Sequence, residues 1–213
     1  NAAGSNIAIY VSKKSGSDVV GNGTQENPFQ TIQTAVNQIP LINRSNTTIF
    51  IEDGVYLEDV RISNCSAASI YIRSIQNVDS LDIKTNVMPV KVRSIGFTYC
   101  QGYFNLYGLE FVDQANAINV FSTKFSAFCE QGGYLSLSKC GFRENTKAFD
   151  HNSLYVGGTG QMSVYDCMFV NQKVMAKANL MADLNFSSPN GSGNETGVIS
   201  STSTVRTSNL SSA

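Results

Sequence analysis

The chain has 213 residues and a formal net charge of −1, which fits one domain with a sizeable core. This near-neutral charge gives no support to electrostatic binding of nucleic acid or of an acidic membrane, and no apolar run is long enough to span a bilayer. Only 15% of the residues are charged, so Asn, Ser, Thr and Gly fill the polar positions, a composition that favours a β-rich protein.

The first predicted element is a short helix at about residues 29–39, bounded by prolines. Its apolar face consists of Phe29, Ile32, Val36 and Ile39, which recur at helical spacing. Residues 48–62 then indicate a strand, a glycine turn and a second strand. A helix that leads into strands is typical of the cap of a β-solenoid, because stacked coils expose their apolar interior at the ends.

This segment carries a resemblance in Phe29-x-Thr31-Ile32-Gln33-x-Ala35-Val36 and Ile51-x-x-Gly54-x-Tyr56-x-Glu58-x-Val60. It resembles the opening segment of the right-handed β-helix superfamily of pectin lyases and pectinesterases. The preceding Ile9-Tyr10-Val11-Ser12, with Gly16-Ser17-Asp18 and Asn22-Gly23-Thr24, is similar to the opening of many bacteriophage tail-fibre and tailspike β-helices. The resemblance implies an all-β fold, a single right-handed parallel β-helix with an N-terminal capping helix.

The centre of the chain contains a degenerate repeat in residues 106–117, 137–148 and 164–175. Its aligned positions hold Phe111, Phe142 and Phe169; two residues earlier Leu109, Cys140 and Cys167; and three residues later Gln114, Asn145 and Gln172. A period of about 30 residues indicates a solenoid with one coil per repeat. We therefore expect the three phenylalanines to point inward and stack, with ladders of small apolar and amide side chains beside them.

The five cysteines show no CxxC spacing, which argues against a zinc site. We expect free thiols, with Cys140 and Cys167 reduced and buried beside the phenylalanine ladder. No metal and no cofactor are expected. Two regions follow from composition: residues 1–182 form the β-helix with its cap, and residues 183–213, rich in Ser, Thr, Asn and Gly, form an extended or inter-subunit strand.

A catalytic site is harder to find in this sequence. His151 follows Asp150, but adjacent strand residues point to opposite faces, so we expect a histidine in a surface turn. Asp113 and Glu144 share one repeat position and should be neighbours, near the separation of a retaining glycosidase pair. The alternative is a solvated column of turn residues, since the third coil has Asn171 there. The active-site motifs of pectinesterases and pectate lyases are not found.

Three functions remain open at this stage. The first is a non-enzymatic phage tail fibre, tailspike or baseplate appendage that binds host glycans, with Tyr99, Gln101, Tyr103 and Tyr107 as candidate binding residues. The second is a polysaccharide depolymerase, a lyase or glycoside hydrolase that uses Asp113 and Glu144. The third is a bacterial adhesin or carbohydrate-binding module. Fold alone does not decide among them.

The first function implies particular partners and a location. We expect a homotrimer in which the tyrosines either contact a host surface polysaccharide or pack between subunits. Other virion tail proteins are the further expected partners, whereas nucleic acid and membrane are not. The protein would fold in the host cytoplasm and then reside in the phage tail of the virion.

Overall fold

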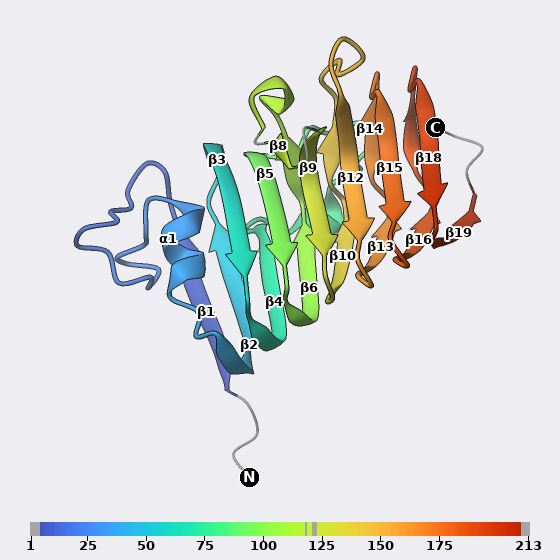
Figure 1. Ribbon diagram of the computed structural model, residues 1–213. Coiled ribbons are helices and arrows are strands. Elements are labelled where there is room, and N and C mark those ends of the chain that lie inside the picture. The colour runs from blue at the N-terminus through green and yellow to red at the C-terminus, as the bar shows by residue number, and fades with distance from the viewer. Residues whose placement is uncertain (1–4, 118, 121–122, 210–213) are drawn as a thin grey trace.

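Strands with alternating buried and exposed side chains dominate the computed structural model, which describes residues 5–117, 119–120 and 123–209. The strands stack side by side in coils, from β1 (Asn6–Val11) at one end to β18 (Thr196–Ser201) and β19 (Thr204–Ser208) at the other (Figure 1). Within the described residues the pairings are parallel, except that β8 (Asn119–Val120) pairs antiparallel with β9 (Thr123–Glu130). The chain is a right-handed parallel β-helix, as the sequence predicts.

One sheet, which we call sheet A, forms a complete side of the solenoid. Its strands follow β1 in the order β2 (Ile42–Ile51), β4 (Ser66–Ser74), β6 (Gln101–Tyr107), β10 (Tyr134–Ser138), β13 (Gln161–Tyr165), β16 (Asp183–Ser187) and β19. The inward residues are Ile, Leu, Val, Phe and Met, and the outward residues are mainly polar or tyrosine. This alternation is what a half-buried strand requires.

The second sheet, sheet B, forks. It begins with β3 (Gly54–Ser63), which pairs with β5 (Val90–Thr98). One branch adds β7 (Leu109–Phe111), β11 (Gly141–Phe142), β14 (Met168–Val170) and β17 (Asn190–Ser192). The other adds β9, β12 (His151–Gly157), β15 (Val174–Asn179) and β18. Two short 3₁₀ turns, η1 (Val78–Ser80) and η2 (Gln114–Asn116), lie in the connections.

The phenylalanine ladder is confirmed. Phe111, Phe142 and Phe169 are fully buried. The rings of Phe111 and Phe142 stack with centroids 4.8 Å apart, and those of Phe142 and Phe169 with centroids 5.0 Å apart. Cys140 and Cys167 lie beside the ladder, both buried and free, so this part of the predicted core is also confirmed.

The predicted amide ladder is only partly correct. Gln114 and Gln172 are buried, and Gln114 Nε2 donates to Gln172 Oε1 at 3.0 Å. Asn145 is exposed, and Thr146 is buried in its place. The reason is local: Asp113 and Asn171 turn the chain with φ of 54° and 55°, whereas Glu144 does not take a positive φ. The turn at Glu144 therefore directs the side chain of Thr146, rather than that of Asn145, into the interior.

The capping helix α1 (Ile32–Asn37) covers the N-terminal end of the core with Ile32, Ala35 and Val36 (Figure 1). It is shorter than the predicted 29–39, because Phe29 is still extended and bridges Val11. Thr31 is the N-cap, and its side chain accepts the Thr34 N–H, as capping requires.

Residues 183–208, which composition set apart, add two strands to sheet A, β16 and β19, and one strand to each branch of sheet B, β17 and β18. β16 and β19 pair in parallel register with each other, and β18 pairs with β15. Leu184 and Phe186 point into the core and are buried. The solenoid therefore continues past residue 182, since ladder hydrogen bonds come from the backbone whatever the side chains. A role between subunits stays a prediction.

Candidate functional site

The outward side of sheet A gathers most of the exposed and half-buried aromatic residues of the described chain, and we call it the aromatic face. Six of the nine tyrosines lie there together with one phenylalanine: Tyr10, Phe50, Tyr71, Tyr103, Tyr107, Tyr134 and Tyr165. Strand register brings them together, because outward residues recur every second position and coils stack about 4.8 Å apart. The face thus draws on residues from β1 to β13.

Ring contacts link neighbouring coils on this face. Tyr10 and Phe50 stack with centroids 5.3 Å apart. Tyr103 makes edge-to-face contacts with Tyr71 at 5.9 Å and with Tyr134 at 5.3 Å. Such geometries are the favoured ones for aromatic pairs, so the rings hold one another in place.

The register divides the outward side chains into three rows along the solenoid axis. The Tyr103 row contains Asn46, Ser69, Tyr103, Tyr134, Gln161 and Asp183. The central row contains Thr48, Tyr71, Asn105, Ser136, Ser163 and Asn185. The Tyr107 row contains Phe50, Arg73, Tyr107, Ser138, Tyr165 and Ser187. Each row therefore contains both short polar side chains and longer aromatic ones.

Hollows lie on both sides of the Tyr103–Tyr134 pair. One, of about 510 Å³, is lined by residues of β1, β2 and β4 and ends at Tyr103. The other, of about 270 Å³, is lined by Tyr134, Gln161, Ser163 and Asn185 and ends at the ion pair between Asp183 and Arg206. A third hollow of about 270 Å³ lies on the turn side of Tyr134.

The connection of residues 75–89 borders the face along the Tyr107 row. Val78, Ile83 and Met88 are buried there and pack against Tyr107, whose hydroxyl donates to Asp79. Burial, with a further contribution from the Asp79 carboxylate, raises the pKa of Tyr107 to about 12.

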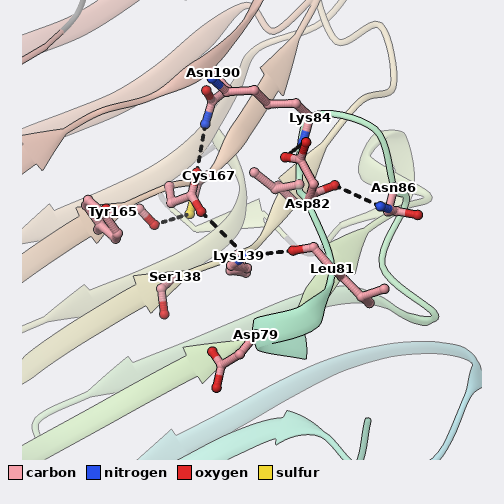
Figure 2. Close-up of polar contacts among 12 residues, drawn as sticks. Asp79, Leu81, Asp82, Lys84, Asn86, Ser138, Lys139, Tyr165, Cys167 and Asn190 are labelled. Carbon is pink, nitrogen blue, oxygen red and sulfur yellow. Dashed lines mark hydrogen bonds and ion pairs between the residues drawn. The ribbon is translucent and has the colours of Figure 1, made fainter. Parts of the chain in front are cut away.

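A residue of a later coil also forms a hydrogen bond with the connection of residues 75–89. Figure 2 shows Lys139, whose Nζ donates to the carbonyl of Leu81 at 2.6 Å and lies 3.8 Å from Asp166 Oδ2. The segment is also tied internally, because the Asn86 side-chain amide donates to the Asp82 carbonyl at 3.1 Å (Figure 2). The border of the aromatic face is therefore a fixed loop.

Of the four residues proposed from sequence for binding, three belong to this side of the molecule. Tyr103 and Tyr107 lie on the outward side of β6, and Gln101 lines the hollow on the turn side of Tyr134. Tyr99 occupies the preceding turn with φ of 55° and is 60% exposed, beyond the three rows. Whether any of them binds a ligand stays a prediction.

Sequence reasoning missed Tyr71 and Tyr134, which make the ring contacts with Tyr103. The signal for Tyr134 was available: the repeat alignment, extended three residues towards the N-terminus, pairs Tyr103 with Tyr134 and Gln161. Tyr71 lies in the coil before the three aligned repeats, in register with Asn105 rather than with Tyr103. No constant spacing in the sequence could have placed it.

Asp113 and Glu144 are neighbours, as their shared repeat position predicts. The Glu144 carboxylate accepts the backbone N–H groups of Asp113 at 2.8 Å and Gln114 at 2.9 Å. Glu58 makes the same contacts to the start of α1, with Ile32 N at 3.0 Å and Gln33 N at 2.9 Å. Glu144 thus holds a turn of the preceding coil by the same capping arrangement.

Asp113 is engaged on its other side. Its Oδ2 lies 3.2 Å from Arg93 Nη1, and Arg93 Nη2 lies 2.7 Å from Asp59 Oδ2. Asn116 donates to Asp113 Oδ1 at 2.6 Å. These contacts make a column of charges of alternating sign over adjacent coils. They give both candidate carboxylates a structural role.

The expectation for His151 is wrong, because its side chain is fully buried in β12. Its Nε2 lies 3.1 Å from Ser126 Oγ, and Ser126 Oγ accepts from Gln114 Nε2 at 3.0 Å. Adjacent residues do point apart, and here it is His151 that faces the interior, while Asp150 is exposed. Burial, then the charge of Lys124, lowers the pKa of His151 to about 3.

The Ser126–His151 pair lacks the third group of a nucleophilic triad. His151 Nδ1 is buried without a hydrogen-bond partner among the described residues, whereas a catalytic histidine is oriented through that nitrogen. A histidine with such a low pKa is also a weak base near neutral pH. The pair is part of a buried polar network with Gln114, Gln172 and Ser153.

The described residues contain no group of three or more His, Cys, Asp or Glu side chains placed to hold a metal ion. None of the helices in the described segments has the length and apolar character to cross a bilayer.

No protein-family model matches the chain, and no curated protein matches its sequence. Among solved structures, the chain is similar to a pectin methylesterase, a mutant crystallised in complex with a hexasaccharide, with 18% sequence identity and a TM-score of 0.44. The match covers 85% of this chain and 56% of that chain, so the chain spans little more than half the length of this relative.

Proposed function

We propose that this chain is a non-enzymatic carbohydrate-binding β-helix that attaches to a host surface polysaccharide through the aromatic face. The observation that supports this proposal is the clustering of six of the nine tyrosines on the outward side of one sheet. Grouped exposed aromatic side chains on a soluble fold mark interaction sites.

The chemistry of the face suits sugars. A tyrosine ring packs on the C–H face of a pyranose and is ordered at low entropic cost, while amide and hydroxyl side chains both donate to and accept from sugar hydroxyls. Within the described part of the chain, the side chains of Asn105, Ser136 and Ser163 form no hydrogen bond with other protein groups. They are therefore available to a ligand.

The proposal extends to a place in a phage tail, as a fibre, spike or baseplate component that assembles as a homotrimer with other virion tail proteins. Its support is the resemblance of residues 9–24 to tail-fibre openings, together with five free cysteines, which fit folding in a reducing cytoplasm. Light scattering at micromolar concentration tests the trimer, and a molar mass equal to that of the monomer would refute this part of the proposal. An adhesin or a carbohydrate-binding module would use the same face.

The depolymerase alternative would place catalysis at Asp113 and Glu144. Both carboxylates already have partners: Glu144 holds two backbone N–H groups, and Asp113 pairs with Arg93. Steady cleavage of a capsular glycan, abolished by Asp113→Asn or Glu144→Gln with the fold intact, would establish the depolymerase instead.

A glycan array with purified protein tests the binding proposal. We expect Tyr103→Ala and Tyr134→Ala each to weaken binding about tenfold or more, because each removes a ring from the centre of the face. Leu57→Ala is the matched control, since Leu57 is 50% exposed on β3 of the other sheet. Equal loss in the control, or no glycan bound by the unmodified chain, would refute the proposal.

A further inference from the structure

Two pairs of cysteines stack across consecutive coils at the corners of the solenoid. Cys65 lies between β3 and β4, and Cys100 lies between β5 and β6 of the next coil. Cys140 lies between β10 and β11, and Cys167 lies between β13 and β14 of the next coil. All four are buried and carry free thiols. The solenoid thus contains two dithiols of the same design, which differ in their surroundings.

The backbone places the members of each pair side by side. Gln101 N donates to the Cys65 carbonyl at 2.8 Å, and Met168 N donates to the Cys140 carbonyl at 2.9 Å. Neighbouring strands lie about 4.8 Å apart, within the range of about 4.4–6.8 Å between Cα atoms that a disulfide spans. In each pair the two thiols are also hydrogen-bonded to each other. A disulfide in either pair therefore requires little movement of the backbone.

A hollow of about 310 Å³ leads to the first pair, and Cys65 belongs to its lining. The hollow lies between the C-terminal end of α1 and the corner that joins β3 to β4, with Val36 on the helix side and Ser63 at the corner. Its volume is within the range of about 300–1,000 Å³ that is usual for small-molecule sites. Cys140 and Cys167 are both 0% exposed, whereas Cys65 is 6% exposed. A small molecule therefore reaches the first pair more easily than the second.

The contact between the two thiols favours a thiolate in the first pair. The hydrogen bond from Cys65 lowers the pKa of Cys100 to about 7, although burial acts in the opposite direction. The same contact, together with burial, raises the pKa of Cys65, so one proton is shared by the two sulfur atoms near neutral pH. In the second pair, burial and then the contact with Cys140 raise the pKa of Cys167. Since the thiolate is the nucleophile of thiol–disulfide exchange, the first pair is the more reactive.

We propose that Cys65 and Cys100 form a redox-active dithiol, which a low-molecular-weight disulfide that enters the hollow converts to an intramolecular disulfide. The shared proton moves to Cys100, and the Cys65 thiolate attacks one sulfur of the small disulfide, which releases a thiolate of the reagent. Cys100 gives its proton to this thiolate, and its own sulfur then attacks Cys65 Sγ. The second thiolate of the reagent leaves and takes up the proton that the pair had given to solvent. The two cysteines lose two electrons, and one small disulfide is reduced to two thiols.

The disulfide would close residues 65–100 into a loop that contains β4, the connection of residues 75–89 and β5. A cross-link over a loop of this length stabilises a protein mainly by restricting the unfolded chain, and the oxidised form should melt about 5–15 °C higher than the reduced form. In a reducing cytoplasm the pair stays open, so oxidising surroundings would cross-link the two coils. This proposal goes beyond glycan binding and does not depend on it.

Oxidation of the folded protein by bis(2-hydroxyethyl) disulfide tests the proposal. After the reaction, the remaining thiols are blocked with N-ethylmaleimide in denaturant, and the peptides are identified by mass spectrometry. We expect three of the five thiols to stay free and one cross-linked pair of peptides, lighter by two hydrogens, to contain Cys65 and Cys100. Dithiothreitol should restore all five thiols and the lower melting temperature.

Variants separate the steps and the route of entry. Cys100→Ser should stop the reaction at a mixed disulfide between Cys65 and one hydroxyethylthio group. Cys140→Ser is the matched control and should form the first disulfide at the rate of the unmodified protein. Ser63→Trp places a ring at the hollow and should slow oxidation at least tenfold, whereas Leu57→Trp, at an exposed position on the same strand, should leave the rate unchanged. Circular dichroism and the melting temperature report whether each variant is folded.

Four results would overturn the proposal. The folded protein keeps five free thiols, or Cys140 and Cys167 are oxidised as fast as the first pair. Alternatively, folded Cys100→Ser forms no mixed disulfide, or folded Ser63→Trp reacts as fast as Leu57→Trp. None of these results bears on glycan binding, which the array tests separately.

Discussion

Replacement of Phe142 by alanine should destabilise the protein more than most other single changes. Phe142 is fully buried and stacks on Phe111 and on Phe169, in each case with an interplanar angle of 4°. A Phe→Ala change in a core costs about 3–5 kcal/mol through lost burial and the cavity left behind. We expect the upper part of this range, because adjacent coils fix the backbone on both sides and the ladder cannot close over the gap.

Urea unfolding followed by circular dichroism measures this loss, and thermal unfolding should show a melting temperature lower by about 6–20 °C for a chain of this size. Tyr165→Ala is the control: Tyr165 is 59% exposed, so its removal should change stability by no more than about 0.5 kcal/mol. An unchanged melting temperature for Phe142→Ala, or equal losses in both variants, would refute the stacked core.

Two further predictions concern buried polar groups. His151 has a folded-state pKa of about 3 against about 6.5 unfolded, so the unfolded chain gains the proton first as pH falls. Stability should be full above pH about 6.5 and lower by about 2 kcal/mol at pH 5; urea unfolding at both pH values should show this loss, which His151→Gln should abolish. The second concerns Glu110, whose side chain is 3% exposed and pairs with Arg143, which in turn donates to the carbonyls of Ile83 and Asn86. Glu110→Ala should lower the free energy of unfolding by about 2–3 kcal/mol, because Arg143 loses its buried partner. Limited proteolysis should then cleave residues 75–89 faster than in the unmodified protein. An unchanged cleavage rate would contradict the view that this ion pair holds the connection in place.

Several features of the molecule could be predicted from local spacing. The face of α1 follows from residues three and four apart, and the ladder of Phe111, Phe142 and Phe169 follows from a repeat of about 30 residues. The helix face requires only the period of an α-helix. The ladder requires only the length of the repeat and the fact that equivalent positions of successive coils stack. The burial of Cys140 and Cys167 follows from the same alignment.

Other features depended on how each coil turns. Asn145 matches Gln114 and Gln172 in the alignment, yet it is exposed, because the turn at Glu144 lacks the positive φ found at Asp113 and Asn171. A single backbone dihedral decides which neighbouring side chain enters the core, and the residue types alone do not specify it.

The candidate site depended most on tertiary structure. The sequence pointed to Tyr103 and Tyr107, which are four residues apart on one strand. The aromatic face also needs Tyr134 and Tyr165 from later coils, and Tyr71 from an earlier one. These side chains meet only through inter-strand register. The sequence by itself determined the solenoid and the composition of its surface, whereas the register between coils decided which surface residues lie together, because strand pairing is set by backbone hydrogen bonds between segments distant in the chain.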